Sequence, residues 1–291
     1  MREAERGLLL LCCALGEEVE PLSRREYGQV MRLLENTGEK AAQGEVTVES
    51  LCILGLSREL AQRVFSLLER PHQPQRYLQA RPDISVLTRI SPDFPQRLRK
   101  LGEECPPAIF CKGDLSLLRQ QAISVVGSRL LEERGAAFAR YMGRLAAKEG
   151  YVLVSGNAVG ADRAAQEACL EAGGSVISVI PDALERCPLR KKQLFVCDEG
   201  YEFAFSAARA LRRNHLIHAL GEKVFVAQCP KTTGGTWAGA SDNLKRSLSP
   251  VYVLDDGSEG MGALRGMGAV FVGDRIPSLR ALQVPQLSIF D

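Results

Sequence analysis

The spacing of apolar residues along the chain changes character near residue 83. Before that point, apolar positions recur at helical intervals, starting with the continuous run Leu8–Leu15. Ser23 and Glu26 have the spacing of a capping box at the start of a helix. We therefore expect residues 1–82 to form a small helical module.

Two further helical patterns in this module meet at Leu54-Gly55-Leu56, and Ser57 is placed to cap the second of them. The arrangement indicates a helix-hairpin-helix unit, which can hold DNA phosphates on the free N–H groups of its second helix. A plain packing hairpin has the same pattern, and the missing glycine-rich turn favours it. The polar, Pro-rich stretch His72–Pro82 is expected to be a linker.

From residue 83 onward, strand-like runs alternate with helix-like runs. Several strand-like runs are continuously apolar, which is typical of strands covered on both faces of a parallel sheet. The alternation predicts an α/β fold, with a Rossmann-like, doubly wound, mostly parallel sheet over residues 83–278 and a C-terminal tail over residues 279–291. Ligands of such sheets bind at the carboxyl ends of the strands. The predicted strands are residues 123–128, 151–156, 175–180, 223–228 and 251–256.

Composition narrows the class of protein. The formal net charge of +2 is too small to indicate nucleic-acid binding by itself, so any such site must come from local clustering. Nine cysteines without a CxxC pair, and only three histidines, argue against a disulfide framework and a metal site. We expect buried thiols in a reducing compartment, no metal and no cofactor. The run Leu8–Leu15 is too short for a membrane span and has acidic neighbours, so we expect a cytoplasmic protein without a signal peptide.

Three turns that follow predicted strands combine glycines with hydroxyl or charged side chains. In the first, Gly127 would let the chain turn tightly, and Ser128 with the next N–H groups would hold an anion at a helix start. Structural alternatives exist for each turn: glycine turns after strands are common, Asp162 is also a favourable carboxylate at a helix start, and Trp237 is more often a packing residue than a base-stacking one. The predicted phosphate-binding residues of these turns are Gly127, Ser128, Arg129, Ser155, Gly156, Gly160, Asp162, Lys231, Thr233, Gly234, Gly235 and Thr236.

A basic segment precedes the third turn. Arg209, Arg212 and Arg213 fall within five residues, and no carboxylate lies between Glu202 and Glu222 to neutralise them. Together with Asn214, Arg212 and Arg213 are predicted to contact a phosphate backbone. A second basic cluster is equally well explained as a solvated surface; it consists of Arg186, Arg190, Lys191 and Lys192.

No catalytic constellation stands out. The chain has no Walker P-loop, no HExxH and no GxSxG, and its first glycine turn is not a GxGxxG. We therefore expect a protein that is not an enzyme. The alternative is a nucleotide-binding Rossmann protein, because Lys231–Trp237 loosely resembles the PGGxGTxxE loop of phosphoribohydrolases. Ala238-Gly239-Ala240 follows where that loop requires its catalytic glutamate.

Residues 84 to 270 resemble the DNA-processing protein A (DprA/Smf) family. The resemblance rests on SPDFPQRL (91–98), CPPAIFCKGDL (105–115), VVGSR (125–129), SGNAVGAD (155–162) and RRNHLIHAL (212–220). It implies a Rossmann-like fold that binds and protects single-stranded DNA, loads the RecA recombinase during natural transformation, and forms a homodimer. Gly127, Ser128, Arg129, Ser155, Gly156, Gly160, Asp162, Arg213 and Asn214 fall on motif positions.

The chain also departs from the family pattern, as expected for a divergent member. Pro181–Leu184 replaces a glycine-rich segment, His215 replaces an arginine, the NFP before RRN is absent, and TTGGTWAGA stands where the family has SGSLITA.

The last residues resemble the short QLxLF peptide by which bacterial replication and repair proteins dock on the β sliding clamp. Gln286, Leu287, Ile289 and Phe290 would be its contact residues. The alternative is a tail that packs on its own domain. A scaffold that docks on the clamp is accordingly a third possible function, beside a DNA binder and a nucleotide-binding protein.

Overall fold

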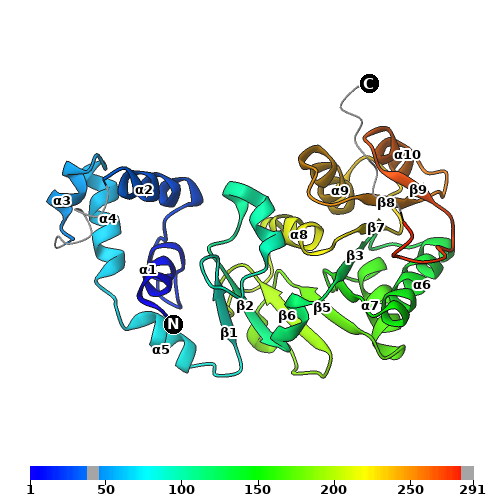
Figure 1. The fold of residues 1–291 in the computed structure, drawn as a ribbon, viewed down its shortest axis with the longest axis horizontal. Helices are drawn as coiled ribbons and strands as arrows, with labels where there is room; N and C mark the ends of the chain where they lie inside the picture. Colours follow the sequence, from blue (N-terminus) through cyan, green and yellow to red (C-terminus); the bar gives the residue numbers. More distant parts are fainter. Residues whose placement is uncertain (38–45, 283–291) are drawn as a thin grey trace.

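The computed structural model of the chain describes residues 1–37 and 46–282. Its N-terminal part is helical, as predicted, and Ser23 caps the second helix: the N–H of Glu26 donates to Ser23 Oγ at 3.3 Å, and the N–H of Ser23 donates to the Glu26 carboxylate at 2.8 Å. The helices are α1 (Glu3–Cys12), α2 (Arg24–Thr37), α3 (Val48–Ile53), α4 (Arg58–Leu68) and α5 (Gln73–Gln79). They lie together beside the sheet (Figure 1).

Helix α1 packs on two sides, which explains its continuous apolar run. Leu8 and Leu11 belong to a core shared with α2, α3 and α4. Leu9 and Leu10 belong to a second core that includes Phe110 in the sheet. The helical part therefore shares apolar core with the rest of the molecule. The predicted division at residue 82 stays a prediction.

The prediction of a linker over His72–Pro82 is wrong, because this stretch contains α5 and a buried aromatic residue. Pro74 lies in the first turn of α5, where a missing N–H costs nothing. The ring of Tyr77 stacks on Tyr201 with centroids 4.2 Å apart, and the Tyr201 N–H donates to Tyr77 Oη at 3.0 Å. Burial of this ring fixes the segment against the sheet.

The sheet has nine strands among the described residues, in the order β1-β2-β6-β5-β4-β3-β7-β8-β9, and all pairs from β6 to β9 are parallel. The predicted α/β class and mostly parallel doubly wound sheet are confirmed. Strands β1 and β2 add an antiparallel edge. The bounds are β1 (Ser85–Thr88), β2 (Ala108–Gly113), β3 (Ala122–Val126), β4 (Val152–Ser155), β5 (Ser175–Val179), β6 (Gln193–Cys197), β7 (Val224–Val226), β8 (Val251–Leu254) and β9 (Val270–Val272).

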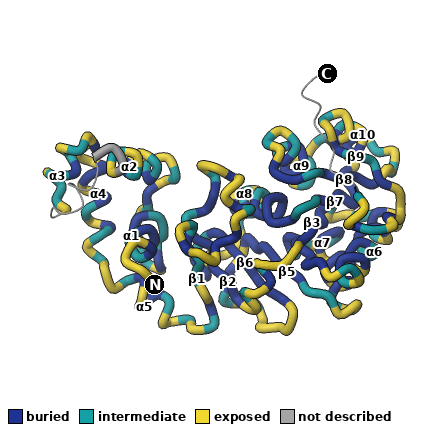
Figure 2. The backbone as a smooth tube through the Cα atoms, viewed as in Figure 1, coloured by how far each residue is buried: buried dark blue, intermediate teal, exposed yellow. Residues whose placement is uncertain are grey.

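Helices cover both faces of this sheet (Figure 1). The central strands are buried along their whole length, as Figure 2 shows. The helices are α6 (Glu133–Glu149) and α7 (Ala161–Glu171) on one face, and α8 (Ala207–Leu220), α9 (Gly234–Arg246) and α10 (Glu259–Gly266) on the other. The described residues also contain the 3₁₀ segments η2 (Gln96–Glu104), η3 (Leu115–Arg119) and η4 (Leu184–Arg186).

Two features of the topology position the functional region. The strand order reverses at β3, which pairs with β4 on one side and β7 on the other, so the loops after β3 and β7 diverge around a crevice. The connection from β5 to β6 contains only η4 and no α-helix. One face of β6 therefore lacks the helix that a βαβ crossover would place there.

The remaining structural expectations concern cysteines and the tail. All nine cysteines are free thiols; five are buried and four are half-buried, so the prediction of buried thiols is confirmed for most of them. Within the described part of the chain, no helix has the length and apolarity to span a membrane. The predicted clamp-binding residues Gln286, Leu287, Ile289 and Phe290 lie outside the described residues.

Candidate functional site

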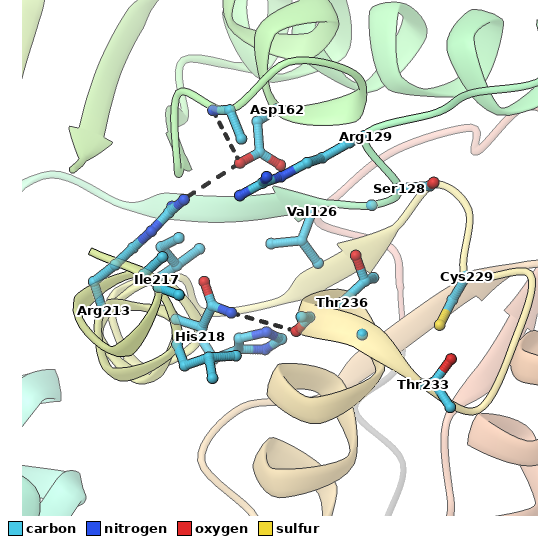
Figure 3. A pocket seen from close by; sticks show the side chains of 18 of the residues that line it. Val126, Ser128, Arg129, Asp162, Arg213, Ile217, His218, Cys229, Thr233 and Thr236 are labelled. Atoms are coloured by element: carbon cyan, nitrogen blue, oxygen red, sulfur yellow. Dashed lines mark hydrogen bonds and ion pairs between the residues drawn. The ribbon is translucent and has the colours of Figure 1, made fainter. Parts of the chain in front are cut away.

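Cavity 1 lies at the point where the strand order reverses, between the ends of β3 and β7, and has a volume of about 610 Å³. Its walls come from all three predicted turns and from α8 (Figure 3). The structure thus gathers most of the predicted site residues at one edge of the sheet. Those that line cavity 1 are Gly127, Ser128, Arg129, Asp162, Arg213, Asn214, Lys231, Thr233, Gly234, Gly235 and Thr236.

Four predicted site residues lie elsewhere. Gly156 lines a neighbouring cavity. Ser155 is buried, and its hydroxyl donates to the carbonyl of Val125 at 2.7 Å. Gly160 precedes α7 with a φ of 96°, and a Cβ there would lie 2.3 Å from a backbone carbonyl of the first turn. Arg212 lies outside cavity 1, among carboxylates.

The first turn uses its backbone in internal contacts. The Ser128 N–H donates to the carbonyl of Gln228 at 2.9 Å, and α6 begins only at Glu133. The expectation that Ser128 stands at a helix start is therefore wrong. Gly127 is required by close packing and not by a tight turn, since a Cβ there would lie 2.6 Å from the Cβ of Ala161.

Asp162 organises the second turn. Its Oδ2 accepts hydrogen bonds from the N–H groups of Gly156 at 3.1 Å and Ala158 at 3.4 Å. Burial raises the pKa of Asp162, and the nearby Arg213 guanidinium and these hydrogen bonds oppose that rise. Two N–H groups of this predicted phosphate-binding turn are thus already satisfied within the protein. Asp162 is an orienting residue at the start of α7.

Arg213 connects α8 to this turn. Its Nη1 donates to the carbonyl of Val179 at 3.1 Å and lies 4.0 Å from Asp162 Oδ2. The guanidinium fills the space that a side chain at position 156 would occupy: a Cβ built on Gly156 would lie 1.4 Å from Nη1. Burial lowers the pKa of Arg213, and Asp162 opposes that shift. The buried guanidinium therefore holds the end of β5 and the second turn together.

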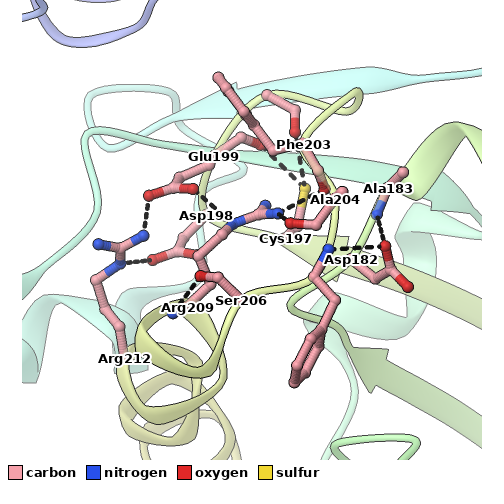
Figure 4. Close-up of polar contacts among 12 residues, drawn as sticks. Asp182, Ala183, Cys197, Asp198, Glu199, Phe203, Ala204, Ser206, Arg209 and Arg212 are labelled. Atoms are coloured by element: carbon pink, nitrogen blue, oxygen red, sulfur yellow. Dashed lines mark hydrogen bonds and ion pairs between the residues drawn. The ribbon is translucent and has the colours of Figure 1, made fainter.

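The other two arginines of α8 are neutralised by the segment after β6 (Figure 4). Arg209 is buried; its Nε lies 2.6 Å from Glu199 Oε2, and its Nη1 also donates to two backbone carbonyls. Arg212 pairs with both Glu199 and Asp198. The expectation that no carboxylate neutralises these arginines is wrong. It considered only the segment between Glu202 and Glu222, whereas Asp198 and Glu199 come just before that segment.

The third turn ends in the start of a helix. Helix α9 begins at Gly234, its first turn carries no acidic residue, and Thr233 at the N-cap makes no side-chain capping bond. Asn214 Nδ2 donates to the carbonyl of Gly235 at 3.3 Å and so joins this turn to α8. Trp237 is partly buried against the core, which favours packing over base stacking.

The rim of cavity 1 carries charges without partners. Arg129 and Lys231 are exposed, and no carboxylate in the described part of the chain lies within ion-pair distance of either. Phe205 lines cavity 1 as well, and 54% of its surface is exposed. Sequence reasoning missed Phe205; the alternation of Phe203 and Phe205 just before α8 is the signal that points to it.

Cavity 2 adjoins cavity 1 and has a volume of about 720 Å³. The two cavities share Arg129, Phe205 and Arg213. The rim of cavity 2 also carries Arg186 and Arg190, which belong to the second basic cluster. That cluster therefore borders the functional region, although Lys191 and Lys192 do not line the cavity.

Two titratable residues that line cavity 1, His218 and Cys229, are uncharged near neutral pH. His218 is buried, its Nδ1 is 3.1 Å from Asn243 Nδ2, and burial lowers its pKa to about 3. Burial raises the pKa of the Cys229 thiol to about 11. Neither group is poised as a general base or as a nucleophile at pH 7.

The sequence of this chain is similar to a known protein family and to individual relatives. The profile of the DNA recombination-mediator protein A family matches residues 85–274. Protein Smf of a Synechocystis strain is 29% identical over 240 residues, which cover 74% of this chain and 56% of that protein. The chain thus spans little more than half the length of this relative.

Two solved structures are similar. DNA processing protein A from Streptococcus pneumoniae has a TM-score of 0.70 at 23% identity, over 94% of this chain and 95% of that one, which shows the same fold. A Helicobacter pylori DNA processing protein A, described with a single-stranded DNA binding mode, has a TM-score of 0.55 at 25% identity over 65% of this chain and 90% of that one. The sheet, its reversal point and the profile match agree, and the chain belongs to the DNA recombination-mediator protein A family.

Proposed function

We propose that this protein binds single-stranded DNA across cavity 1. The observation that carries the proposal is the pair of exposed cations Arg129 and Lys231, which have no carboxylate partner among the described residues, beside the uncapped start of α9. Positive charge free of carboxylates is what a phosphate backbone requires, because binding then releases counterions without breaking internal ion pairs. Family membership, and the binding mode described for the Helicobacter pylori relative, support DNA as the ligand.

A single strand suits the cavity better than a duplex does. Phe205 is exposed at the boundary of the two cavities, where an unpaired base can stack on its ring. In a duplex the bases are already stacked on one another and offer no free face. The phosphates would lie along Arg129, Lys231 and the residues of the first and third turns that line cavity 1, while buried Arg213 and Asp162 would hold the turns in place.

The residues around cavity 1 support binding without catalysis. His218 and Cys229 are uncharged at neutral pH, and Asp162 is occupied by backbone N–H groups and Arg213. We infer a binding protein and not an enzyme. Release of ribose phosphate from a nucleoside monophosphate by the purified protein would contradict this.

The finer parts of the proposal rest on family membership. We infer a role in DNA uptake and recombination, with transfer of the strand to a RecA-type recombinase, a homodimeric state and a cytoplasmic location. Docking of the segment Gln286–Phe290 on the β sliding clamp is a separate proposal, supported by sequence alone. Equilibrium titration of labelled single-stranded and duplex oligonucleotides tests the central proposal. Saturable binding of a free nucleotide without any binding of the strand would replace it.

A further inference from the structure

A third cavity, which we name the interface cavity, lies between the N-terminal helices and the α/β part of the chain, with a volume of about 520 Å³. Cys12 of α1 and Tyr27 of α2 line it from one side; Pro107 before β2, Asp198 after β6 and Arg212 of α8 line it from the other. It shares no lining residue with cavity 1. Its volume lies in the range of small-molecule sites, so a ligand there would contact both parts of the chain outside the proposed strand site.

Asp198 brings a buried acceptor to this cavity. Only 9% of its surface is exposed, and its Oδ2 has no hydrogen-bond partner. Arg212 Nε lies 3.4 Å and Arg24 Nη2 lies 3.8 Å from that oxygen, beyond the roughly 2.7–2.9 Å of a charge-assisted hydrogen bond. Figure 4 shows Asp198 beside Arg212. A buried carboxylate oxygen without a hydrogen bond destabilises a fold, so it calls for a ligand that donates N–H groups.

Arg89 brings a positive charge that no carboxylate neutralises in the part of the chain that the structure describes. Its guanidinium lies over the ring of Tyr27, 5.1 Å from the ring centroid. The second carboxylate of the cavity, Glu199, is already paired with Arg209 and Arg212. Arg89 can therefore bind an anionic group of a ligand, such as a phosphate.

The remaining walls include apolar and uncharged side chains. Leu22 and Pro107 line the cavity, as do the thiols of Cys12 and Cys105. Burial raises the pKa of Cys12 to about 12 and also raises the pKa of Cys105, although Arg89 opposes both shifts, so both thiols are uncharged at neutral pH. Such walls suit the faces of a flat ring. The matching ligand has a flat ring, N–H donors along one edge, and an anionic group.

Among the nucleobases, guanine fits a carboxylate best. Its N1–H and 2-amino groups stand side by side and can donate to both oxygens of one carboxylate, which only accepts hydrogen bonds. Adenine and cytosine carry a ring-nitrogen acceptor beside their amino group, and uracil and thymine carry carbonyls on both sides of N3–H. Each of these acceptors would face the second carboxylate oxygen and repel it.

We propose that the interface cavity binds a free guanine nucleotide, whose base edge donates to the carboxylate of Asp198 and whose phosphate contacts Arg89. The site goes beyond the proposed function and does not depend on it, because the two cavities have separate walls.

Equilibrium titration of the full chain with guanosine, inosine and adenosine monophosphates tests the base. Inosine monophosphate keeps N1–H but lacks the 2-amino group, so the wild type should bind it roughly ten- to a hundredfold more weakly than guanosine monophosphate, as expected for the loss of a hydrogen bond to a charged group. Adenosine monophosphate should bind more weakly still. Equal affinities for the three nucleotides, or no binding of any, overturn the inference.

Asp198→Asn reverses the hydrogen-bonding demand at one position. The new amide can donate to the 2-carbonyl of xanthine, so this variant should prefer xanthosine monophosphate over guanosine monophosphate. A gained affinity cannot come from a failure to fold. Asp255→Asn, an exposed aspartate outside the cavity, should behave as wild type. An Asp198→Asn variant that still prefers guanosine monophosphate overturns the inference.

Arg89→Ala tests the phosphate contact. It should weaken the binding of guanosine monophosphate and leave the binding of guanosine, which has no phosphate, unchanged. An equal loss for both ligands overturns the role of Arg89. Displacement of the nucleotide by oligothymidylate, which contains no guanine, would place it in the strand site and also overturns the inference. A guanine preference in a protein that binds no strand removes the proposed function and leaves this inference standing.

Discussion

The guanidinium of Arg213 occupies the place where Gly156 lacks a side chain: a Cβ at position 156 would lie 1.4 Å from Arg213 Nη1. Only glycine at this position leaves room for the arginine to reach the carbonyl of Val179 and approach Asp162. One glycine of the second turn thus determines the position of a cation that the sequence places more than fifty residues later.

Gly156→Ala should therefore displace Arg213 from both partners. Because the guanidinium can swing toward the cavity, we expect a loss of about 1–3 kcal/mol in the free energy of unfolding, measured by denaturant titration. Gly262→Ala is the matched control, since that exposed helical glycine has no neighbour within 4 Å of an added Cβ. It should be neutral or slightly stabilising. Equal stability of the two variants would show that Arg213 does not need this space.

A double-mutant cycle tests the coupling of Asp162 and Arg213. Each partner is buried, so Asp162→Ala or Arg213→Met alone should cost about 3 kcal/mol of stability by leaving the other charge unpaired. The double variant should be less destabilised than the sum of the two, by about 1–3 kcal/mol. If the same denaturant titrations show that the losses of stability of the two single variants simply add in the double variant, Asp162 and Arg213 do not stabilise each other across their 4.0 Å separation.

Arg129 and Arg212 should differ in their effect on strand affinity. Arg129 has no carboxylate partner in the described structure, so Arg129→Ala should weaken binding roughly tenfold and reduce the salt slope by about 1. Arg212 is paired with Asp198 and Glu199, so Arg212→Ala should change affinity little. Anisotropy titrations over a series of salt concentrations measure both, with the exposed Arg144→Ala as control. A larger loss for Arg212→Ala would restore the sequence-based assignment of Arg212 to phosphate.

Stability should fall at low pH because of Glu5. Ser91 Oγ donates to its carboxylate at 2.7 Å, and this bond, with the Arg2 N–H, lowers the pKa of Glu5 from 4.5 to about 2. The carboxylate's contribution is fully present above pH 4.5 and is lost as the pH falls toward 2, up to about 3 kcal/mol. Glu5→Gln should be less stable than wild type at pH 7 and show a flatter pH dependence. Glu3→Gln, an exposed neighbour in the same turn, should leave the wild-type pH profile unchanged.

Local sequence signals predicted much of the fold. The continuously apolar runs predicted five parallel strands because strands covered on both faces need no polar side. Ser23 and Ser57 marked two helix starts because capping depends on residues within one turn. The convergence of three turns followed from the rule that parallel strands end at one edge of the sheet.

What the sequence could not predict depends on contacts between distant segments. Strand β6 was missed because a charged stretch precedes its short apolar run. The pairing of Arg209 and Arg212 with Glu199 arises only when the segment after β6 folds against α8. The sequence could not show that the basic cluster near Arg190 borders a cavity. That cavity lies where the connection from β5 to β6 contains no α-helix.

The central claim is that unpartnered cations at the reversal point of the sheet hold a single strand. The most direct test is fluorescence anisotropy of one labelled oligonucleotide, single-stranded and as a duplex, titrated with wild-type protein at low and at physiological salt. We predict tighter binding of the single strand than of the duplex, with an affinity that falls steeply as salt increases. No binding at low salt, or a preference for the duplex, would contradict the account.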